Sequence, residues 1–113
     1  MAELTFILNM LELIAARFKA LTEPARLQIL QCLRGGVRTV TELVDETGMG
    51  QANVSKHLRQ LHALGFVRRR NEGRFAYYVL ADTSVFKLCD IMCGRLEAET
   101  KAKSRMLTTR ERP

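Results

Sequence analysis

The sequence predicts a mainly α-helical chain with one β-hairpin, in the order α-α-α-α-β-β-α. Over most of the 113 residues, apolar side chains recur every three or four positions, which is the spacing of amphipathic helices. Between Phe66 and Leu80 the period falls to two, which is typical of strands. A hydrophobic fraction of 47% with 27% charged residues is ordinary for a packed protein, so we expect a single domain over 1–113.

Two helices are expected in the first third of the chain. Apolar residues at helical spacing run from Leu4 to Leu21 and predict an amphipathic first helix. The segment 22–24, Thr-Glu-Pro, then supplies a cap and a proline near the first position of a second helix. That helix has an apolar stripe and ends at Gly35-Gly36. The stripe consists of Leu27, Leu30 and Leu33.

A short helix, a glycine-containing turn and a further helix are expected between 39 and 64. Thr39 and Glu42 match a capping box, in which each side chain accepts a hydrogen bond from the other residue's backbone amide. The short helix that follows Thr39 stops at Gly48. After the turn, the segment 51–64 places its leucines and Val54 on one side and polar residues elsewhere, and Gly65 ends it.

The remaining chain predicts a hairpin, a last helix and a tail. Strand-like segments at 66–70 and 74–80 flank the turn signal Asn71-Glu72-Gly73, which indicates a β-hairpin with a basic tip. Asp82 or Thr83 can cap a final helix that runs at least to Glu99. Residues 101–113 are basic and lack an apolar pattern, so we expect a frayed tail. A helix-turn-helix followed directly by a basic hairpin is a winged helix-turn-helix.

The distribution of charge indicates the kind of partner. The net charge is +6, and the segment 51–80 holds six cationic side chains against a single carboxylate, Glu72. Clustered positive charge favours a polyanion such as double-stranded DNA. No apolar run approaches the ~20 residues of a membrane span. Glu3 stands where a signal peptide would be basic, so we expect a cytoplasmic protein without membrane association and with reduced cysteines.

Three motifs follow one another along the chain. Leu21–Leu27 reads Leu-Thr-Glu-Pro-Ala-Arg-Leu, and Gln51–Leu58 reads Gln-Ala-Asn-Val-Ser-Lys-His-Leu. Gly73-Arg74 and the segment 77–82, Tyr-Tyr-Val-Leu-Ala-Asp, come next. In this order the motifs resemble the opening, the reading head and the wing of the ArsR/SmtB family of bacterial winged-helix repressors. The resemblance covers nearly the whole chain and implies transcription regulation by DNA binding.

Candidate DNA contacts lie on the second helix of the helix-turn-helix and on the hairpin. A helix fits the major groove, where Gln, Asn and Ser read base edges and Lys and Arg hold phosphates. The alternative interpretation is an ordinary solvated helix face. Because side chains alternate along a strand, the hairpin arginines cannot all face DNA, and Arg69 is expected to serve the sheet or a surface ion pair. The candidates are Gln51, Asn53, Ser55, Lys56, Arg59, Arg68, Arg70 and Arg74.

The cysteines leave three interpretations open. Cys89 and Cys93 are four residues apart on one helix face, within reach of a shared thiophilic metal or metalloid, with Cys32, Asp90 or a second subunit as a further ligand. Alternatively the thiols respond to oxidants or sulfur species, and the placement of Cys32 and Cys93 resembles the family's sulfur-sensing members. In the third interpretation they only pack an apolar dimer face, and there is no cofactor. His57 and His62 are expected to be structural.

The combined prediction is a homodimeric repressor on a pseudo-palindromic operator, with two reading heads about one helical turn apart. A thiophilic or thiol-reactive inducer would release it. The alternative is a winged-helix regulator or interaction module with structural cysteines and no inducer. A thiol-redox enzyme is disfavoured because the chain lacks a Cys-x-x-Cys motif, so we expect no enzymatic activity. The expected dimer face lies on the first and last helices and consists of Ile7, Leu11, Ile14, Val85, Leu88, Met92 and Leu96.

Overall fold

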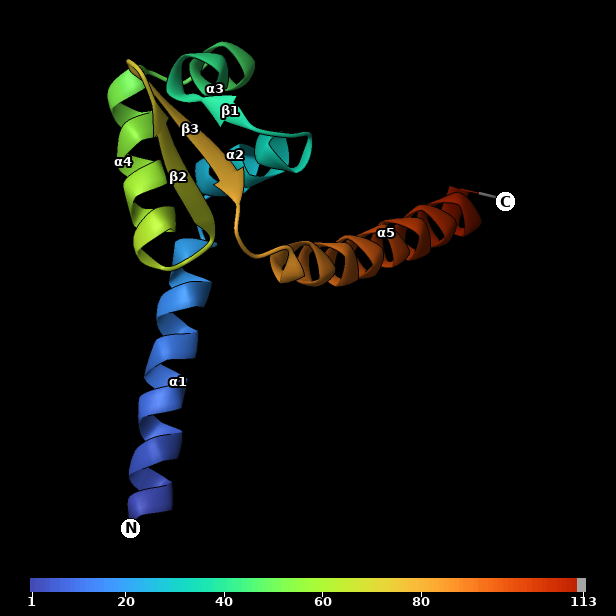
Figure 1. The fold of residues 1–113 in the computed structure, drawn as a ribbon. Helices are drawn as coiled ribbons and strands as arrows, with labels where there is room; N and C mark the ends of the chain where they lie inside the picture. Colours follow the sequence, from blue (N-terminus) through green and yellow to red (C-terminus); the bar gives the residue numbers. More distant parts are fainter. Residues whose placement is uncertain (112–113) are drawn as a thin grey trace. The chain divides into compact units, whose positions relative to one another are not determined.

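The protein is described here by a computed structural model that covers the backbone of residues 1–111 and the side chains to Lys103 (Figure 1). The backbone forms two compact units, which meet between Asp82 and Thr83 in the sequence. The first unit contains four helices and three strands, and the second is a single helix. In chain order these elements are α1 (Ala2–Ala20), α2 (Pro24–Arg34), β1 (Arg38–Thr39), α3 (Val40–Thr47), α4 (Gln51–Ala63), β2 (Val67–Glu72), β3 (Phe75–Leu80) and α5 (Ser84–Glu111).

The predicted order of helices and hairpin is confirmed, with one addition. The two-residue strand β1 pairs antiparallel with β3, so the sheet has the order β1-β3-β2. Sequence patterning missed β1 because a period cannot be read over two residues. The pairing of Arg38 with Tyr78 joins the segment before α3 to the hairpin.

The core of the first unit lies where α2, α3 and α4 pack on one another and on the hairpin. It is apolar and fully enclosed, and three residues from the apolar stripe of α4 lie in it. The residues most completely buried in this unit are Ile29, Leu30, Leu43, Val54, Leu58 and Leu61. Leu27 is only half-buried, and Ile29 takes its expected place in the interior.

The hairpin turns two residues later than the sequence indicated. Asn71 and Glu72 are paired in β2, opposite Ala76 and Phe75, so only Gly73 and Arg74 form the loop. Gly73 has a φ of +59°, and no residue other than glycine has a positive φ in the described chain. A positive φ at the first loop position alone is the pattern of a type II′ turn, which matches the twist of the flanking strands.

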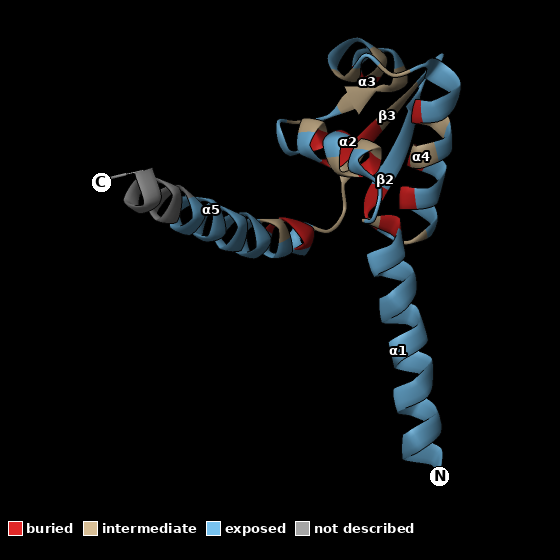
Figure 2. Ribbon diagram, turned by 180° about the vertical axis from the view of Figure 1, so that it is seen from behind, coloured by how far each residue is buried: buried red, intermediate tan, exposed pale blue. Residues whose placement is uncertain are grey.

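Helix α1 is exposed along almost its whole length, and Figure 2 shows it in the colour of exposed residues. Only Ala20, its last residue, is buried. The second unit, α5, begins directly after Thr83 and continues to Glu111, so the backbone of 101–111 is helical where the sequence predicted a tail. Residues 112–113 of that predicted tail lie outside the described residues. Within the described chain, no helix is both long enough and apolar enough to cross a bilayer.

Candidate nucleic-acid interface

The helix-turn-helix is built by local signals at both ends of α3. The Thr39 hydroxyl accepts from the Glu42 amide at 3.2 Å, and the Glu42 carboxylate accepts from the Thr39 amide at 3.0 Å. The predicted capping box is therefore confirmed. At the other end, Gly48 adopts a φ of +74°, which ends the helix and turns the chain toward α4. A side chain at this position would be strained.

Helix α4 presents a polar and cationic side opposite its buried stripe. Gln51, Asn53, Lys56 and Arg59 are exposed, whereas Ser55 is half-buried. The helix begins at Gly50 without a side-chain cap, so its first amides are left for another acceptor. Neither Lys56 nor Arg59 lies within ion-pair distance of a carboxylate among the residues whose side chains are described. All the α4 candidates except Ser55 are therefore open to a ligand.

The register of the hairpin sorts its arginines onto two faces. Arg69 is paired with buried Tyr78, and Arg68 and Arg70 point to the opposite face because side chains alternate. The three consecutive arginines are therefore divided between the two faces of the hairpin. The Arg69 Nε donates to the Asn71 side chain at 3.1 Å.

Arg70 already has two partners within the hairpin. Its Nε lies 2.8 Å from a Glu72 carboxylate oxygen, and its guanidinium lies 5.9 Å from the centre of the Tyr77 ring. Arg68 and Arg74 are exposed and have no such partner among the described side chains. An exposed Phe75 stands beside the turn with its ring 6.5 Å from that of Tyr77.

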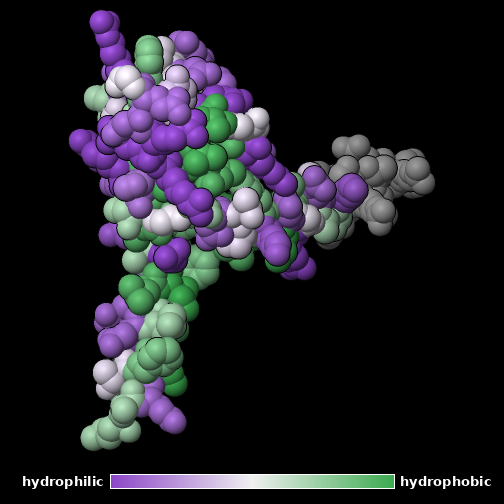
Figure 3. Space-filling model, in the orientation of Figure 1, coloured by the Kyte–Doolittle hydropathy of each residue, from purple (hydrophilic) through white to green (hydrophobic). Residues whose placement is uncertain are grey.

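The hairpin and α4 are neighbours in the first unit. Helix α4 packs against β2. In both Figure 1 and Figure 2 the hairpin tip lies at the end of the unit where α4 begins. On the face seen in Figure 3, hydrophilic residues predominate over the part of this unit outside α1, and hydrophobic residues lie along much of α1. The cationic side chains of α4 and of the hairpin are thus carried by two elements that pack against each other.

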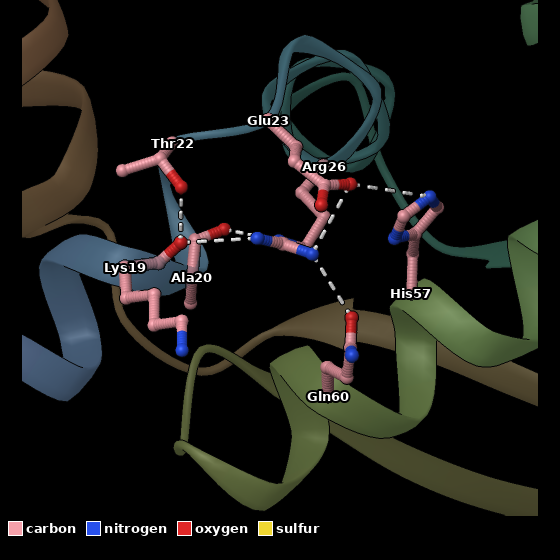
Figure 4. Close-up of polar contacts among 7 residues, drawn as sticks. All are labelled: Lys19, Ala20, Thr22, Glu23, Arg26, His57 and Gln60. Carbon is pink, nitrogen blue, oxygen red and sulfur yellow. Dashed lines mark hydrogen bonds and ion pairs between the residues drawn. The ribbon is translucent and has the colours of Figure 1, made fainter.

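A buried arginine behind α4 was not singled out as functional from the sequence. The Arg26 side chain, on α2, is 8% exposed and contacts α1, α4 and Glu23, which precedes α2 (Figure 4). Its position three and seven residues before Ile29 and Leu33 puts it on the buried face of α2, and this spacing was the available signal. A charged side chain inside such a stripe needs several partners.

The two histidines lie on α4 in different surroundings. The His57 side chain is 12% exposed, and its Nε2 lies 3.9 Å from a Glu23 carboxylate oxygen. His62 is exposed near the end of α4. Among the described residues, no three His, Cys, Asp or Glu side chains lie close enough together to hold a metal ion.

The three cysteines are free thiols with different surroundings. Cys32 and Cys89 are half-buried, and Cys93 is exposed. Burial, followed by a hydrogen bond to Glu46, raises the pKa of the Cys32 thiol. The nearby Glu97 carboxylate raises the pKa of the Cys93 thiol, whose Sγ lies 3.6 Å from Glu97 Oε1. For both thiols the raised pKa lowers the fraction present as the nucleophilic thiolate.

Most of the predicted dimer face is exposed in the single chain. Val85 is the exception, because it is only 2% exposed. The other candidates on α1 and on α5 have exposed fractions between 40% and 59%. They are Ile7, Leu11, Ile14, Leu88, Met92 and Leu96.

A short capped helix, a glycine turn, an exposed polar helix and a basic hairpin define the DNA-binding domain of a winged helix-turn-helix transcription regulator. The family described as "Bacterial regulatory protein, arsR family" matches residues 23–69. The chain is 37% identical over 93 residues to a "Probable mercury resistance operon repressor" of Streptomyces lividans, covering 82% of this chain and 73% of that protein. The chain belongs to the ArsR family, whose members are transcription regulators and not enzymes.

Further relatives agree with this assignment. The regulator NmtR of Mycobacterium tuberculosis is 44% identical over 77 residues, and the match spans 68% of this chain and 64% of NmtR. A solved winged helix-turn-helix DNA-binding domain from Mycobacterium bovis, described as homodimeric, has a TM-score of 0.71 at 32% identity and covers 83% of this chain and 87% of its own. NolR from Sinorhizobium fredii gives a TM-score of 0.69 at 30% identity, over 74% and 84% of the two chains.

Proposed function

We propose that the protein is a transcriptional repressor that binds double-stranded DNA as a homodimer on a pseudo-palindromic operator. The observation that carries this proposal is the exposed polar and cationic side of α4 beside a hairpin whose Arg68 and Arg74 have no carboxylate partner among the described side chains. In this proposal Gln51, Asn53 and Ser55 read bases or backbone. The phosphate contacts are Lys56, Arg59, Arg68, Arg70 and Arg74. We also propose that the protein acts in the cytoplasm.

The homodimer is supported by the unpartnered apolar surface of α1. Nine large apolar side chains from Leu4 to Phe18 are at least 40% exposed, which is an extensive patch for an isolated chain. Burial of such a surface against a second copy is favourable in proportion to its area. The related M. bovis domain is described as homodimeric.

The finer proposal is release by a thiophilic or thiol-reactive inducer at Cys89 and Cys93. Their spacing puts both thiols on one face of α5, and one relative is described as a mercury resistance operon repressor. Substitution of Cys89 and Cys93 by serine is then expected to leave DNA binding intact and to abolish release by Zn(II), Cu(I), arsenite, peroxide or polysulfide. Normal release in both variants would show that the thiols only pack and do not sense the inducer.

The test of the main proposal is a gel-shift titration of operator-containing DNA across a range of salt concentrations. Binding through several phosphates releases counterions, so the affinity is expected to fall steeply as salt rises. Salt-independent binding, or none to any fragment, rejects the repressor and favours a protein-interaction module.

A further inference from the structure

Helix α1 is attached to the rest of the first unit only near its C-terminal end. Every residue before Ala20 is exposed, and Ala20 is 5% exposed. One side contact comes from Arg17, whose guanidinium lies 5.8 Å from the centre of the Phe66 ring, just before β2. The direction of the long helix is therefore decided by a few contacts at its base.

The central contact at this base is the Arg26 guanidinium (Figure 4). Its Nε donates to the Ala20 carbonyl, and its Nη2 donates to the Lys19 carbonyl at 3.0 Å. These carbonyls belong to the last turn of α1, and the Lys19 carbonyl also accepts from the amide and the hydroxyl of Thr22. Arg26 thus holds the end of α1 from the neighbouring helix α2.

The same guanidinium also contacts α4, the proposed recognition helix. Its Nη1 donates to Gln60 Oε1 on α4 at 3.0 Å and lies 3.3 Å from a Glu23 carboxylate oxygen. Glu23 in turn approaches His57 of α4. Because a guanidinium is planar and its donors have fixed directions, one side chain contacts the last turn of α1 and the last turn of α4 together.

We propose that Arg26 is the positioning residue that sets the direction of α1 relative to α4, and so the separation of the two reading heads in the dimer. The inference rests on the proposed function, in which α1 lies in the dimer interface. At a rise of 1.5 Å per residue α1 is roughly 28 Å long, so a tilt of about 10° at its base moves its far end by about 5 Å. That displacement exceeds the spacing of one base pair along DNA.

The experiment measures DNA affinity for duplexes in which the distance between two half-sites is varied by single base pairs. Gln60→Leu removes the acceptor on α4 and keeps the volume of the side chain, and Gln28→Leu makes the same change on the exposed side of α2 as a control. Wild type and the control are expected to prefer one separation. Gln60→Leu is expected to reduce the ratio of the affinity at the preferred separation to the affinity at other separations about five- to tenfold, because the two reading heads are no longer held at one distance.

Arg26→Lys, which loses the planar fork, is expected to broaden the preference in the same way. If it fails to fold in a thermal unfolding experiment, Gln60→Leu still decides. An equal loss of affinity at every separation, or no change, overturns the inference because the contact is then only structural. If the wild type itself binds no duplex or shows no preferred separation, the proposed function fails and the inference fails with it.

Discussion

At the scale of single residues, the surroundings of each cation decide what it can contribute to DNA binding. Lys56 and Arg59 project from α4, while Arg70 is already held by Glu72. The sequence predicted that one hairpin arginine, Arg69, would serve the sheet or a surface ion pair instead of contacting DNA. It could not show that Arg70 is ion-paired, because the turn was expected at 71–73 and Glu72 was therefore placed outside the strand.

Lys56→Ala and Asn53→Ala are expected to separate affinity from specificity. Loss of the Lys56 charge weakens binding to all sequences and reduces the salt slope by about 1, because one phosphate contact is lost. Loss of the Asn53 amide removes about 1–3 kcal/mol of discrimination at one base pair. Affinities for a set of single-base operator variants check both. Unchanged affinities in both variants would exclude this face of α4 from the interface.

Glu72→Gln is expected to strengthen DNA binding. The change removes a negative charge from the hairpin and releases Arg70 from its ion pair at 2.8 Å. Glu99→Gln is the matched control, since it removes a carboxylate from another exposed arginine pair, with Arg95 at 3.9 Å. Gel shifts at low and high salt compare the two variants. Weaker binding by Glu72→Gln would mean that Arg70 contacts DNA only when its ion pair with Glu72 positions it.

Glu97→Gln is expected to speed alkylation of Cys93 at neutral pH. The Glu97 carboxylate raises the pKa of this thiol, so the fraction present as reactive thiolate near pH 7 is reduced. Without that carboxylate the pKa falls toward the ordinary range and the thiolate fraction increases. Peptide mass spectrometry after timed iodoacetamide treatment measures the rate. Glu3→Gln on α1 is the control, and equal rates in wild type and Glu97→Gln would contradict the electrostatic explanation.

At the scale of elements, periodicity and capping signals predicted the helices well, and tertiary context decided what they missed. The capping box of α3 is complete within four residues, so it was predictable. Strand β1 exists only through its pairing with β3, which no local pattern encodes. Arg26 was part of a recognised motif, but its role depends on carbonyls and an amide brought together by three helices.

Thr39→Ala is expected to lower the free energy of unfolding by about 1 kcal/mol through loss of the helix cap. Thr41 is exposed on the first turn of the same helix and makes no capping hydrogen bond, so Thr41→Ala is the control. Urea unfolding of both variants measures the difference. A cost at Thr41 as large as that at Thr39 would show that threonine itself, and not the cap, matters here.

At the scale of the whole molecule, the account depends on a second copy. The sequence predicted an apolar stripe on α1, but a stripe alone does not distinguish a buried helix from an interface. The exposure of that stripe in the folded chain favours the interface. The single-domain prediction and the geometry of the dimer depend on how α5 and the partner pack, which local sequence patterns do not determine.

Leu11→Glu is expected to give a monomer with weakened DNA binding, because it places a charge within the proposed apolar face. Asn9→Glu puts the same charge on another side of α1 and is expected to stay dimeric. Sedimentation equilibrium measures the mass of each variant, and gel shifts measure its affinity. A Leu11→Glu variant that remains dimeric would remove this stripe from the interface.

The most direct test of the central claim is selection of bound duplexes from a random DNA pool by the intact protein. If two reading heads act together, the recovered sequences are inverted repeats with half-site centres about one helical turn apart. Recovery of unpaired half-sites, or of no sequence in preference to any other, would contradict the account.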